Sequence, residues 1–210
     1  MIQILDGGIG RYLKQIGAPF RQPEWSALAL IEDPSSVTKA HHAFIDAGAN
    51  IITTNSYAVV PFHIGDKRFL EQGAKLIALA GSLARQVQDE NLADVTVAAG
   101  IPPVFGSYKP GEFRTEEAIS RLKLFKKHLL PFTNIVLAET QSSIQEVITI
   151  QRVFANCGQP LWISMTLEDQ TAEQSRLRSG ESLVEALEAI DYEQVDTCLL
   201  YTSDAADDSL

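Results

Sequence analysis

The sequence has few cysteines and few basic residues, and each shortage excludes a class of protein. Only two cysteines, Cys157 and Cys198, occur among 210 residues, so no disulfide framework is expected. Lysine and arginine total 17 against 27 aspartates and glutamates, which gives a formal net charge of −10. This charge argues against a nucleic-acid partner, whose phosphates require a basic face, and against binding to anionic membranes.

Long apolar runs are also missing. No stretch of the sequence approaches the roughly 20 apolar residues that a membrane helix needs. Residues 1–6 lack the basic start and the apolar run of a signal peptide. Hydrophobic residues make up 45% of the chain and charged residues 21%, as is usual in globular proteins. We therefore expect a cytoplasmic protein with one domain and small-molecule partners.

Short β-branched runs alternate with longer amphipathic stretches along the chain. This pattern predicts strands at residues 2–5, 51–54, 95–99, 134–137 and 161–165, and the start of a sixth at Val195-Asp196. It predicts helices at residues 68–88, 115–130, 143–156 and 183–190, and one from Asp33-Pro34-Ser35 to Gly48. Such alternation implies parallel strands joined by right-handed crossovers.

Two α/β folds fit this order, an open doubly wound sheet and a (β/α)8 TIM barrel. No Walker A sequence is present, and Leu13 stands where the third glycine of a dinucleotide fingerprint would follow Gly8-Ile9-Gly10. Polar residues recur just after the predicted strands, at the rim where barrels build their active sites. These residues are Asp6, Asn55, Glu139 and Thr166. The pattern therefore favours the barrel.

Two acidic residues are candidates for ligand binding. Asp6 precedes two glycines and can approach a ligand amine closely, although Asp-Gly is also common in turns and the turn is favoured on local grounds. Glu139 follows an apolar run, and a carboxylate near a barrel interior needs a partner or a ligand. The alternative for Glu139 is a capping role for the next helix.

The aromatic and amide candidates have packing alternatives. Asn55 and Tyr57 offer an amide and an aromatic plane, but turn chemistry and a packed tyrosine are equally ordinary. Trp25 is either a pocket wall or a plug of the barrel, and packing is favoured.

The histidines and the free cysteines show no metal-ligand spacing. His63 lies in a loop that could approach the site, whereas three histidines on predicted helices are expected to be packed or solvated. These are His41, His42 and His128. Cys157 is expected to be a small buried hydrophobe.

The last residues break the pattern. Residues 198–210 turn from an apolar start to an acidic, alanine-rich end, and the string resembles the conceptual translation of a DNA sequencing adapter. We predict that residues 198–210 are a non-native tail, which should be excluded from fold reasoning. The alternative is a natural acidic tail.

Taken together, the motifs resemble the homocysteine S-methyltransferase family. The matching segments are Leu5-Asp6-Gly7-Gly8-Ile9-Gly10, Trp25-Ser26-Ala27, Asp33-Pro34, residues 47–57, Ala138-Glu139-Thr140, Ser164-Met165-Thr166 and Ser179-Gly180-Glu181. The resemblance implies a (β/α)8 TIM barrel truncated after about five βα units, with residues 1–197 as a partial homocysteine-binding domain. It also implies zinc-activated transfer of a methyl group from S-methylmethionine or S-adenosylmethionine to the homocysteine thiol, giving methionine.

The resemblance assigns roles to five residues. It implies that Asp6 and Glu139 hold the amino-acid portion of homocysteine, with Thr140 beside them, and that Asn55 and Tyr57 line the pocket. The family's zinc is held by three cysteine thiolates at positions that this chain does not contain. Zinc is therefore expected in the full-length protein, and the 210-residue fragment is expected to be inactive, with no metal ligand and no catalytic residue.

Two departures and two alternatives accompany the resemblance. Arg11 stands where the family commonly has threonine, and residues 101–104 replace the usual Ser-x-Gly-Pro, which leaves the methyl donor open. One alternative is a metal-independent barrel enzyme that uses Asp6 and Glu139 as acid and base. The other is a non-catalytic remnant that binds an amino acid.

Overall fold

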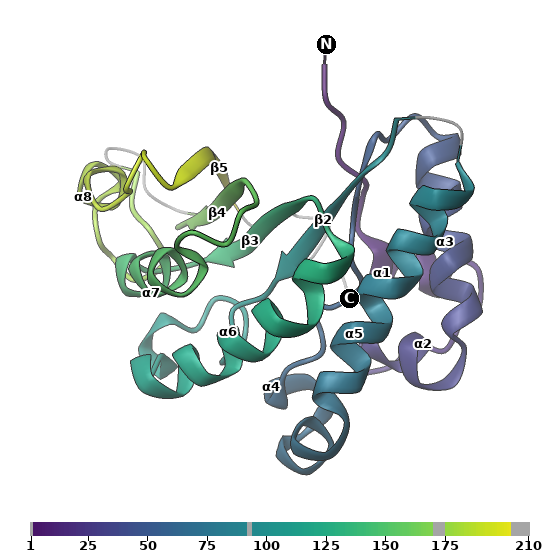
Figure 1. Cartoon of the computed structure of the whole chain (residues 1–210). Helices are drawn as coiled ribbons and strands as arrows, with labels where there is room; N and C mark the ends of the chain where they lie inside the picture. Colours follow the sequence, from purple (N-terminus) through teal and green to yellow (C-terminus); the bar gives the residue numbers. More distant parts are fainter. Residues whose placement is uncertain (1, 92–93, 170–174, 203–210) are drawn as a thin grey trace.

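The computed structural model describes residues 2–91, 94–169 and 175–202 (Figure 1). Helices and strands alternate through these residues. The helices are α1 (Ile9–Gln15), α2 (Ala27–Glu32), α3 (Pro34–Asp46), α4 (Pro61–Ile64), α5 (Asp66–Glu90), α6 (Thr115–Leu129), α7 (Ile144–Phe154) and α8 (Leu183–Glu188), with 3-10 turns at Pro110–Glu112 and Leu130–Phe132. The strands are β1 (Ile51–Thr53), β2 (Thr96–Ile101), β3 (Ile135–Gln141), β4 (Leu161–Leu167) and β5 (Val195–Thr202).

The five strands form one parallel sheet whose spatial order follows the chain order, β1-β2-β3-β4-β5. A doubly wound sheet would reverse direction at a switch point, and the described strands contain no such reversal. The sheet is therefore an arc of a singly wound barrel, which confirms the predicted α/β barrel class. Figure 1 shows the arc, with α5, α6 and α7 on one side of it.

The face of the sheet that meets the helices is the main core. The side chains of Ala99, Val136, Ala138 and Ile163 point outward and belong to one apolar cluster. The same cluster contains Phe125 of α6 and apolar residues of α5 and α7. Burial of this layer is the main source of stability, because free energy gained on folding scales with the apolar area removed from water.

The opposite face of the sheet is the inner surface of the barrel. Successive strand residues point to opposite faces, so Ile51, Ala98, Ile135 and Leu137 point inward and form a separate small cluster. Residues two positions further along each strand continue this inner face toward the carboxyl ends. Because of this alternation, Glu139 lies on the inner face of the barrel, near the carboxyl end of β3.

The structure differs from the sequence prediction at several elements. The predicted strand at residues 2–5 forms only an isolated parallel bridge between Leu5 and Ile51, and Ile2 and Ile4 are exposed. Helices α1, α2 and α4 were not predicted; they are short, so their apolar periodicity covers two turns or fewer. Strand β3 continues through Gln141, whereas the prediction ended this strand at Leu137.

Part of the segment predicted as a non-native tail is described. Residues 198–202 belong to β5, which pairs with β4 along its length, while residues 203–210 lie outside the described residues. The tail assignment stays a prediction. Within the described ranges, no helix combines the length and the apolarity required to cross a membrane.

Candidate functional site

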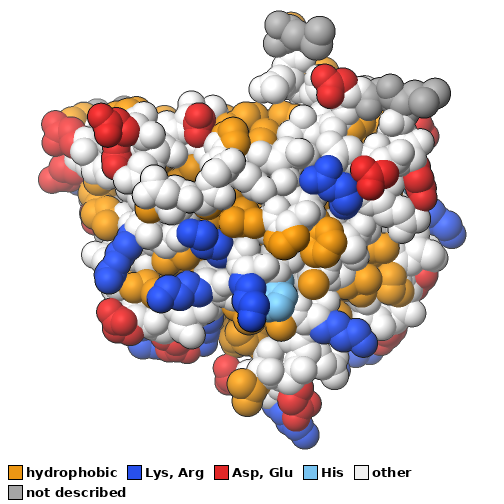
Figure 2. All heavy atoms as spheres, in the orientation of Figure 1, with side chains coloured by type: hydrophobic (Ala, Val, Ile, Leu, Met, Phe, Trp, Pro, Cys, Tyr) orange, Lys and Arg blue, Asp and Glu red, His pale blue; other side chains and the backbone are white. Residues whose placement is uncertain are grey.

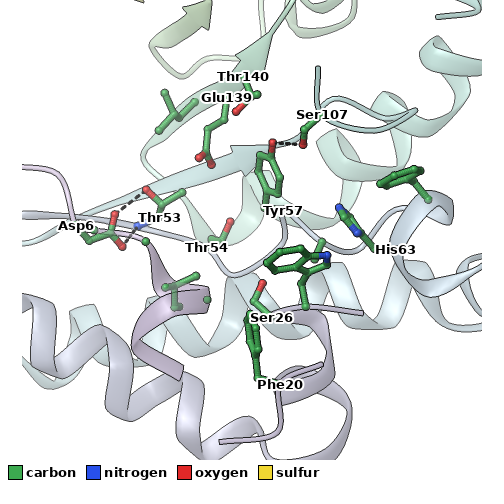
Figure 3. A pocket seen from close by; sticks show the side chains of 18 of the residues that line it. Asp6, Phe20, Ser26, Thr53, Thr54, Tyr57, His63, Ser107, Glu139 and Thr140 are labelled. Carbon is green, nitrogen blue, oxygen red and sulfur yellow. Dashed lines mark hydrogen bonds between the residues drawn. The ribbon is translucent and has the colours of Figure 1, made fainter. Parts of the chain in front are cut away.

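A cavity of about 930 Å³ opens at the carboxyl ends of β1, β2 and β3. Its wall is formed by the segment around Asp6, the loop that precedes α2, the loop after β1, the loop after β2 and the end of β3 (Figure 3). Among the described residues that line it, two are carboxylates and none is lysine or arginine. The cavity therefore has the negative potential that favours a cationic group.

Asp6 is a fixed carboxylate at one end of the cavity. The backbone N–H of Thr53 donates to Asp6 Oδ2 at 2.8 Å, and the Thr53 hydroxyl donates to Asp6 Oδ1 at 3.0 Å. The Asp6 N–H donates to the carbonyl of Ile51 at 2.9 Å, and this bond holds the segment around Asp6 beside β1. Each oxygen of Asp6 thus accepts one hydrogen bond and retains lone pairs for a ligand.

Glu139 brings a second carboxylate to the same end, because its side chain crosses the inner face of β2 at Gly100. A Cβ at position 100 would stand 2.9 Å from Glu139 Oε1 and 2.9 Å from Thr53 Cγ2, so only glycine leaves this space open. The described residues supply no hydrogen-bond donor to the Glu139 carboxylate, which points toward Asp6 in Figure 3. A glycine inside a strand is a recognised sign of such a close approach.

Burial shifts the protonation of both carboxyl groups. Burial raises the pKa of Asp6 to about 6, although the two bonds from Thr53 act in the opposite direction. Burial, followed by the negative charge of Asp6, raises the pKa of Glu139 to about 8. Near neutral pH the pair therefore tends to hold one proton between its two carboxyl groups.

Backbone strain is concentrated at this cavity. Positive φ angles occur at Trp25 (47°), Tyr108 (62°) and Thr140 (60°), and all three residues line the cavity. A positive φ is most unfavourable for a β-branched residue such as Thr140. The register of β3 and β4 shifts between Ala138 and Gln141, which brackets both Glu139 and Thr140. Strain of this kind persists where surrounding contacts hold it, and it clusters at functional sites.

Tyr57 connects three parts of the wall. Its hydroxyl lies 2.6 Å from Ser107 Oγ, and it is also hydrogen-bonded to the side chain of Thr140. Burial raises the pKa of Tyr57 above its usual value. The Arg178 guanidinium carbon lies 4.4 Å from the ring centre of Tyr108. Tyr57 therefore holds the loop after β2 against the end of β3.

Four of the five predicted site residues meet at this cavity, and Asn55 does not. Asp6, Tyr57, Glu139 and Thr140 line it. Asn55 is buried behind the wall, where its Nδ2 donates to the carbonyl of Ser26 at 3.0 Å and its Oδ1 has no partner among the described residues. Asn55 thus supports the position of Ser26, which does line the cavity.

Sequence reasoning missed several residues of the wall. Phe20, Thr53, Phe62 and Ser107 were not singled out, and only the glycine inside β2 offered a local signal for the Glu139 approach. Trp25 proves to be both packed and part of the wall, with its ring edge-on to Phe20 at 5.6 Å. His63 reaches the cavity, but it lies in the short helix α4 and not in a loop as predicted.

The remaining histidines and the cysteines lie away from the cavity lining. His41 is fully buried in α3 with no partner for either ring nitrogen among the described residues, and burial lowers its pKa to about 4. Cys157 follows α7 and is half-buried. Cys198 packs on the helix-facing core rather than on the inner face. Within residues 2–91, 94–169 and 175–202, no three His, Cys, Asp or Glu side chains form a group that could hold a metal ion.

The fold and the cavity together define an α/β-barrel protein with an acidic, aromatic-walled site at the carboxyl ends of its first strands. The chain belongs to the homocysteine S-methyltransferase family, whose model matches residues 3–204. This membership confirms the resemblance found in the motifs.

Curated relatives agree with this membership. Homocysteine S-methyltransferase 1 of Brassica oleracea var. italica is 26% identical over 215 residues, which cover 89% of this chain and 64% of the relative. Homocysteine S-methyltransferase YbgG of Bacillus subtilis is 27% identical and covers 79% of this chain and 59% of its own length. The chain thus spans about 64% of the length of the Brassica relative.

A solved structure supports the fold. The metallated form of the homocysteine methyltransferase MmuM from Escherichia coli superposes with a TM-score of 0.80 at 23% identity, over 95% of this chain and 74% of the other. Because the sequence identity is 23%, this structural likeness is evidence for the fold alone.

Proposed function

We propose that the protein to which this chain belongs transfers a methyl group to the thiol of homocysteine, giving methionine. The described residues form the half of the site that binds the amino-acid portion of the substrate. Family membership and the paired carboxylates in a cavity without lysine or arginine in its lining support this proposal. The cytoplasmic location expected from the sequence stays a prediction.

The observation that carries the proposal is the position of Glu139 opposite Asp6. Asp6 is held by Thr53, whereas the Glu139 carboxylate faces the cavity without a described donor. An α-ammonium group placed between them supplies three N–H donors and a positive charge, and both carboxyl groups then ionise. Charge-assisted hydrogen bonds of this kind are the strong ones. Thr140 and Tyr57 hold the surrounding wall.

The reaction itself is a displacement at carbon. The homocysteine thiol loses its proton, sulfur forms a bond to the methyl carbon, and the carbon–sulfur bond of a sulfonium donor breaks to leave a neutral thioether. S-methylmethionine and S-adenosylmethionine are sulfonium donors of this type. The thiolate is the nucleophile, and a free thiol is mostly protonated at neutral pH.

Zinc is the group that the family resemblance implies for forming the thiolate. The described residues do not fit a zinc site, because they bring no three suitable side chains together and Cys198 faces the helices. In the metal-independent alternative, Asp6 and Glu139 act as acid and base. The observation in its favour is that the two carboxyl groups line the same cavity, where burial raises the pKa of each.

Calorimetric titration tests the binding half of the proposal. Homocysteine should bind the 210-residue chain, and 4-mercaptobutyrate, which has the same carbon chain, thiol and carboxylate but no amine, should bind at least about tenfold more weakly. Asp6→Asn and Glu139→Gln should each remove this preference, whereas Glu116→Gln, at an exposed position of α6 outside the cavity lining, serves as the control. Equal binding of the two thiols would exclude the assignment of Asp6 and Glu139.

A metal-free assay separates the two catalytic alternatives. Full-length protein treated with a chelator should lose methyl transfer if a metal forms the thiolate. Activity that survives chelation and disappears in Glu139→Gln would instead establish the metal-independent enzyme.

A further inference from the structure

His63 belongs to the wall between two cavities. It lines the substrate cavity and also a second pocket of about 750 Å³ near the start of α5. Pro23 lines both as well, and the bond between His63 Nδ1 and the Pro23 carbonyl, 3.0 Å long, closes the wall between them. In Figure 3, His63 lies at the end of the cavity opposite Asp6, with Tyr57 between them.

The Pro23 carbonyl sets the tautomer of the neutral ring. A carbonyl oxygen only accepts hydrogen bonds, so Nδ1 carries the hydrogen and Nε2 presents a lone pair. The described residues give the ring no other hydrogen-bond partner. Burial lowers the pKa of His63, and the bond to Pro23 partly offsets this effect. His63 is therefore a neutral acceptor at neutral pH.

The end of the cavity around His63 is aromatic. The ring of Phe62 meets the imidazole edge-on at 4.9 Å, and Phe20, Tyr57 and Tyr108 belong to the same wall. Aromatic faces attract cations that have no N–H to donate, such as sulfonium groups. With two carboxylates at the other end and no lysine or arginine in the described lining, His63 is the lining side chain that can become positive by protonation.

Charged groups surround His63 on its other side. The second pocket is lined by the ionisable residues Glu24, Asp66, Lys67, Arg68 and Glu71, and Lys109 lies 4.7 Å from the Phe62 ring centre. Glu24 is paired with Arg21 at 3.1 Å and with Arg68 at 3.7 Å. Lys109 is paired with Glu112 at 3.0 Å. Arg178 lies 4.4 Å from the ring centre of Tyr108 in the same wall. Among the described side chains that line this end of the cavity, His63 is the one that gains a positive charge on protonation.

We propose that His63 determines the specificity of this end of the cavity for a sulfonium ligand. The neutral imidazole admits the sulfonium with its Nε2 lone pair facing the positive charge, and the imidazolium excludes it. The inference rests on the proposed function, because a sulfonium is the methyl donor in that reaction. It adds a specificity-determining residue outside the carboxylate pair.

Comparison of a cation with its neutral counterpart isolates the effect of His63. S-methylmethionine and methionine share the α-amino acid group, so the effect of Asp6 and Glu139 on that group cancels in the ratio of their dissociation constants. The effect of these carboxylates on the sulfonium charge does not cancel, so the ratio is compared between the wild type and His63→Gln. Between pH 8 and pH 5, we expect the preference for S-methylmethionine to fall about tenfold further in the wild type than in His63→Gln, as expected for like charges several ångströms apart. A ratio that is constant over this range would overturn the proposal.

Two substitutions separate the contribution of the His63 Nε2 acceptor from that of the charge on its ring. His63→Gln places a non-titrating acceptor near the position of Nε2, and at pH 5 it should keep more of the preference for S-methylmethionine than the wild type does. His63→Asn keeps a donor for the Pro23 carbonyl but lacks the Nε2 acceptor, and it should show a weaker preference with the same pH dependence as His63→Gln. The same pH dependence in the wild type and in His63→Gln would contradict the assignment.

Reciprocal linkage supplies a measurement that needs no variant for its outcome. If the imidazolium excludes the sulfonium, saturating S-methylmethionine must lower the pKa of His63. An NMR titration of the imidazole C–H signals measures this pKa. Saturating methionine should leave that pKa unchanged. Equal effects of the two ligands would exclude the charge effect. Glutamine and asparagine variants of His41, His42 and His128 assign the four signals.

Failure of this inference and failure of the proposed function give different results. If homocysteine binds and requires Glu139, but S-methylmethionine shows no preference over methionine at any pH, only the His63 assignment is wrong. If homocysteine binds no better than 4-mercaptobutyrate, the proposed function fails, whatever the ratio of the S-methylmethionine and methionine dissociation constants.

Discussion

The outer and inner faces of the sheet are made by alternate residues of the same strands, yet they differ in composition. Ala99 and Ala138 point outward into the helix-covered core, whereas their neighbours Gly100 and Glu139 point inward to the cavity. The outer face gains free energy by burying apolar area. The inner face holds a buried carboxyl group and a strained residue, both of which reduce stability. Because successive residues of a strand point to opposite faces, residues that stabilise the fold and residues that line the cavity alternate along the same strand.

Figure 2 extends the comparison to the surface. Acidic side chains gather at the α8 end of the face shown, and hydrophobic side chains lie exposed among scattered lysines and arginines. The acidic excess of the chain is thus found on the outside as well as in the cavity.

The largest effect is expected from an outer-face substitution. Phe125 of α6 is completely buried, so Phe125→Ala should lower the free energy of unfolding by about 3–5 kcal/mol. Urea denaturation measures this loss. Lys123→Ala, at an exposed position of the same helix, should change stability by less than about 0.5 kcal/mol. The affinity of folded Phe125→Ala for homocysteine should equal that of the wild type, and a lower affinity would show that the two faces are coupled.

On the inner face, Glu139→Gln should raise stability while it reduces binding. The pKa of Glu139 in the folded protein, about 8, lies above its ordinary value of 4.5. The favourable contribution of this carboxyl group is therefore complete below pH 4.5 and is lost as the pH rises through 8. At pH 8 the variant should be more stable by about 1–3 kcal/mol, and at pH 4 the difference should vanish. A variant that is less stable than the wild type at pH 8 would show that Glu139 has a favourable partner.

Gly100→Ala should reduce binding as well as stability, because the added methyl group meets Thr53 Cγ2 at 2.9 Å and the backbone oxygen of Thr54 at 3.1 Å. The added methyl group would meet Glu139 Oε1 at 2.9 Å and displace the carboxylate from β2. We expect homocysteine affinity to fall about tenfold, which corresponds to about 1.4 kcal/mol. The matched variant Ala99→Gly changes the neighbouring outward position and should lower stability without changing affinity. Unchanged affinity in Gly100→Ala would mean that the Glu139 side chain does not have to lie across Gly100 for homocysteine to bind.

The smallest effect is expected at Thr140. Glycine accepts a φ of 60° without strain, so Thr140→Gly should be more stable than Thr140→Ala by about 1 kcal/mol. Both variants lack the hydroxyl, so their difference isolates the backbone term, and thermal denaturation can measure it. Equal stability of the two variants would show that the positive φ is not strained.

Much of the fold could be predicted because its elements are long and periodic. The helices α5 and α6 and the strands β1, β2 and β4 have buried apolar residues at the spacing of their element, so the pattern locates them within a few residues. The short helices could not be found in this way, because their residues are buried by distant segments. Residues 2–5 have strand-like composition, yet only Leu5 forms a bridge.

The candidate site was predicted in part. Asp6 and Glu139 could be named from the family motifs, whereas local chemistry favoured a turn for Asp6 and left Glu139 open. Asn55 belongs to the same motif as Tyr57, but the direction of its side chain places it behind the wall, bonded to Ser26. Direction depends on backbone geometry after the strand ends, which the residue types do not specify.

The sequence by itself determined the alternation of strands and helices, the acidic charge and the family, because periodicity, composition and motif order are properties of neighbouring residues. Only the tertiary structure decided that Glu139 lies across Gly100 opposite Asp6, and that His63 shares a wall with Pro23. These contacts join segments 39 to 133 residues apart, and burial there moves the pKa values of both carboxyl groups toward neutrality. The physical reason is that desolvation depends on everything packed around a group, and most of those neighbours are distant in the chain.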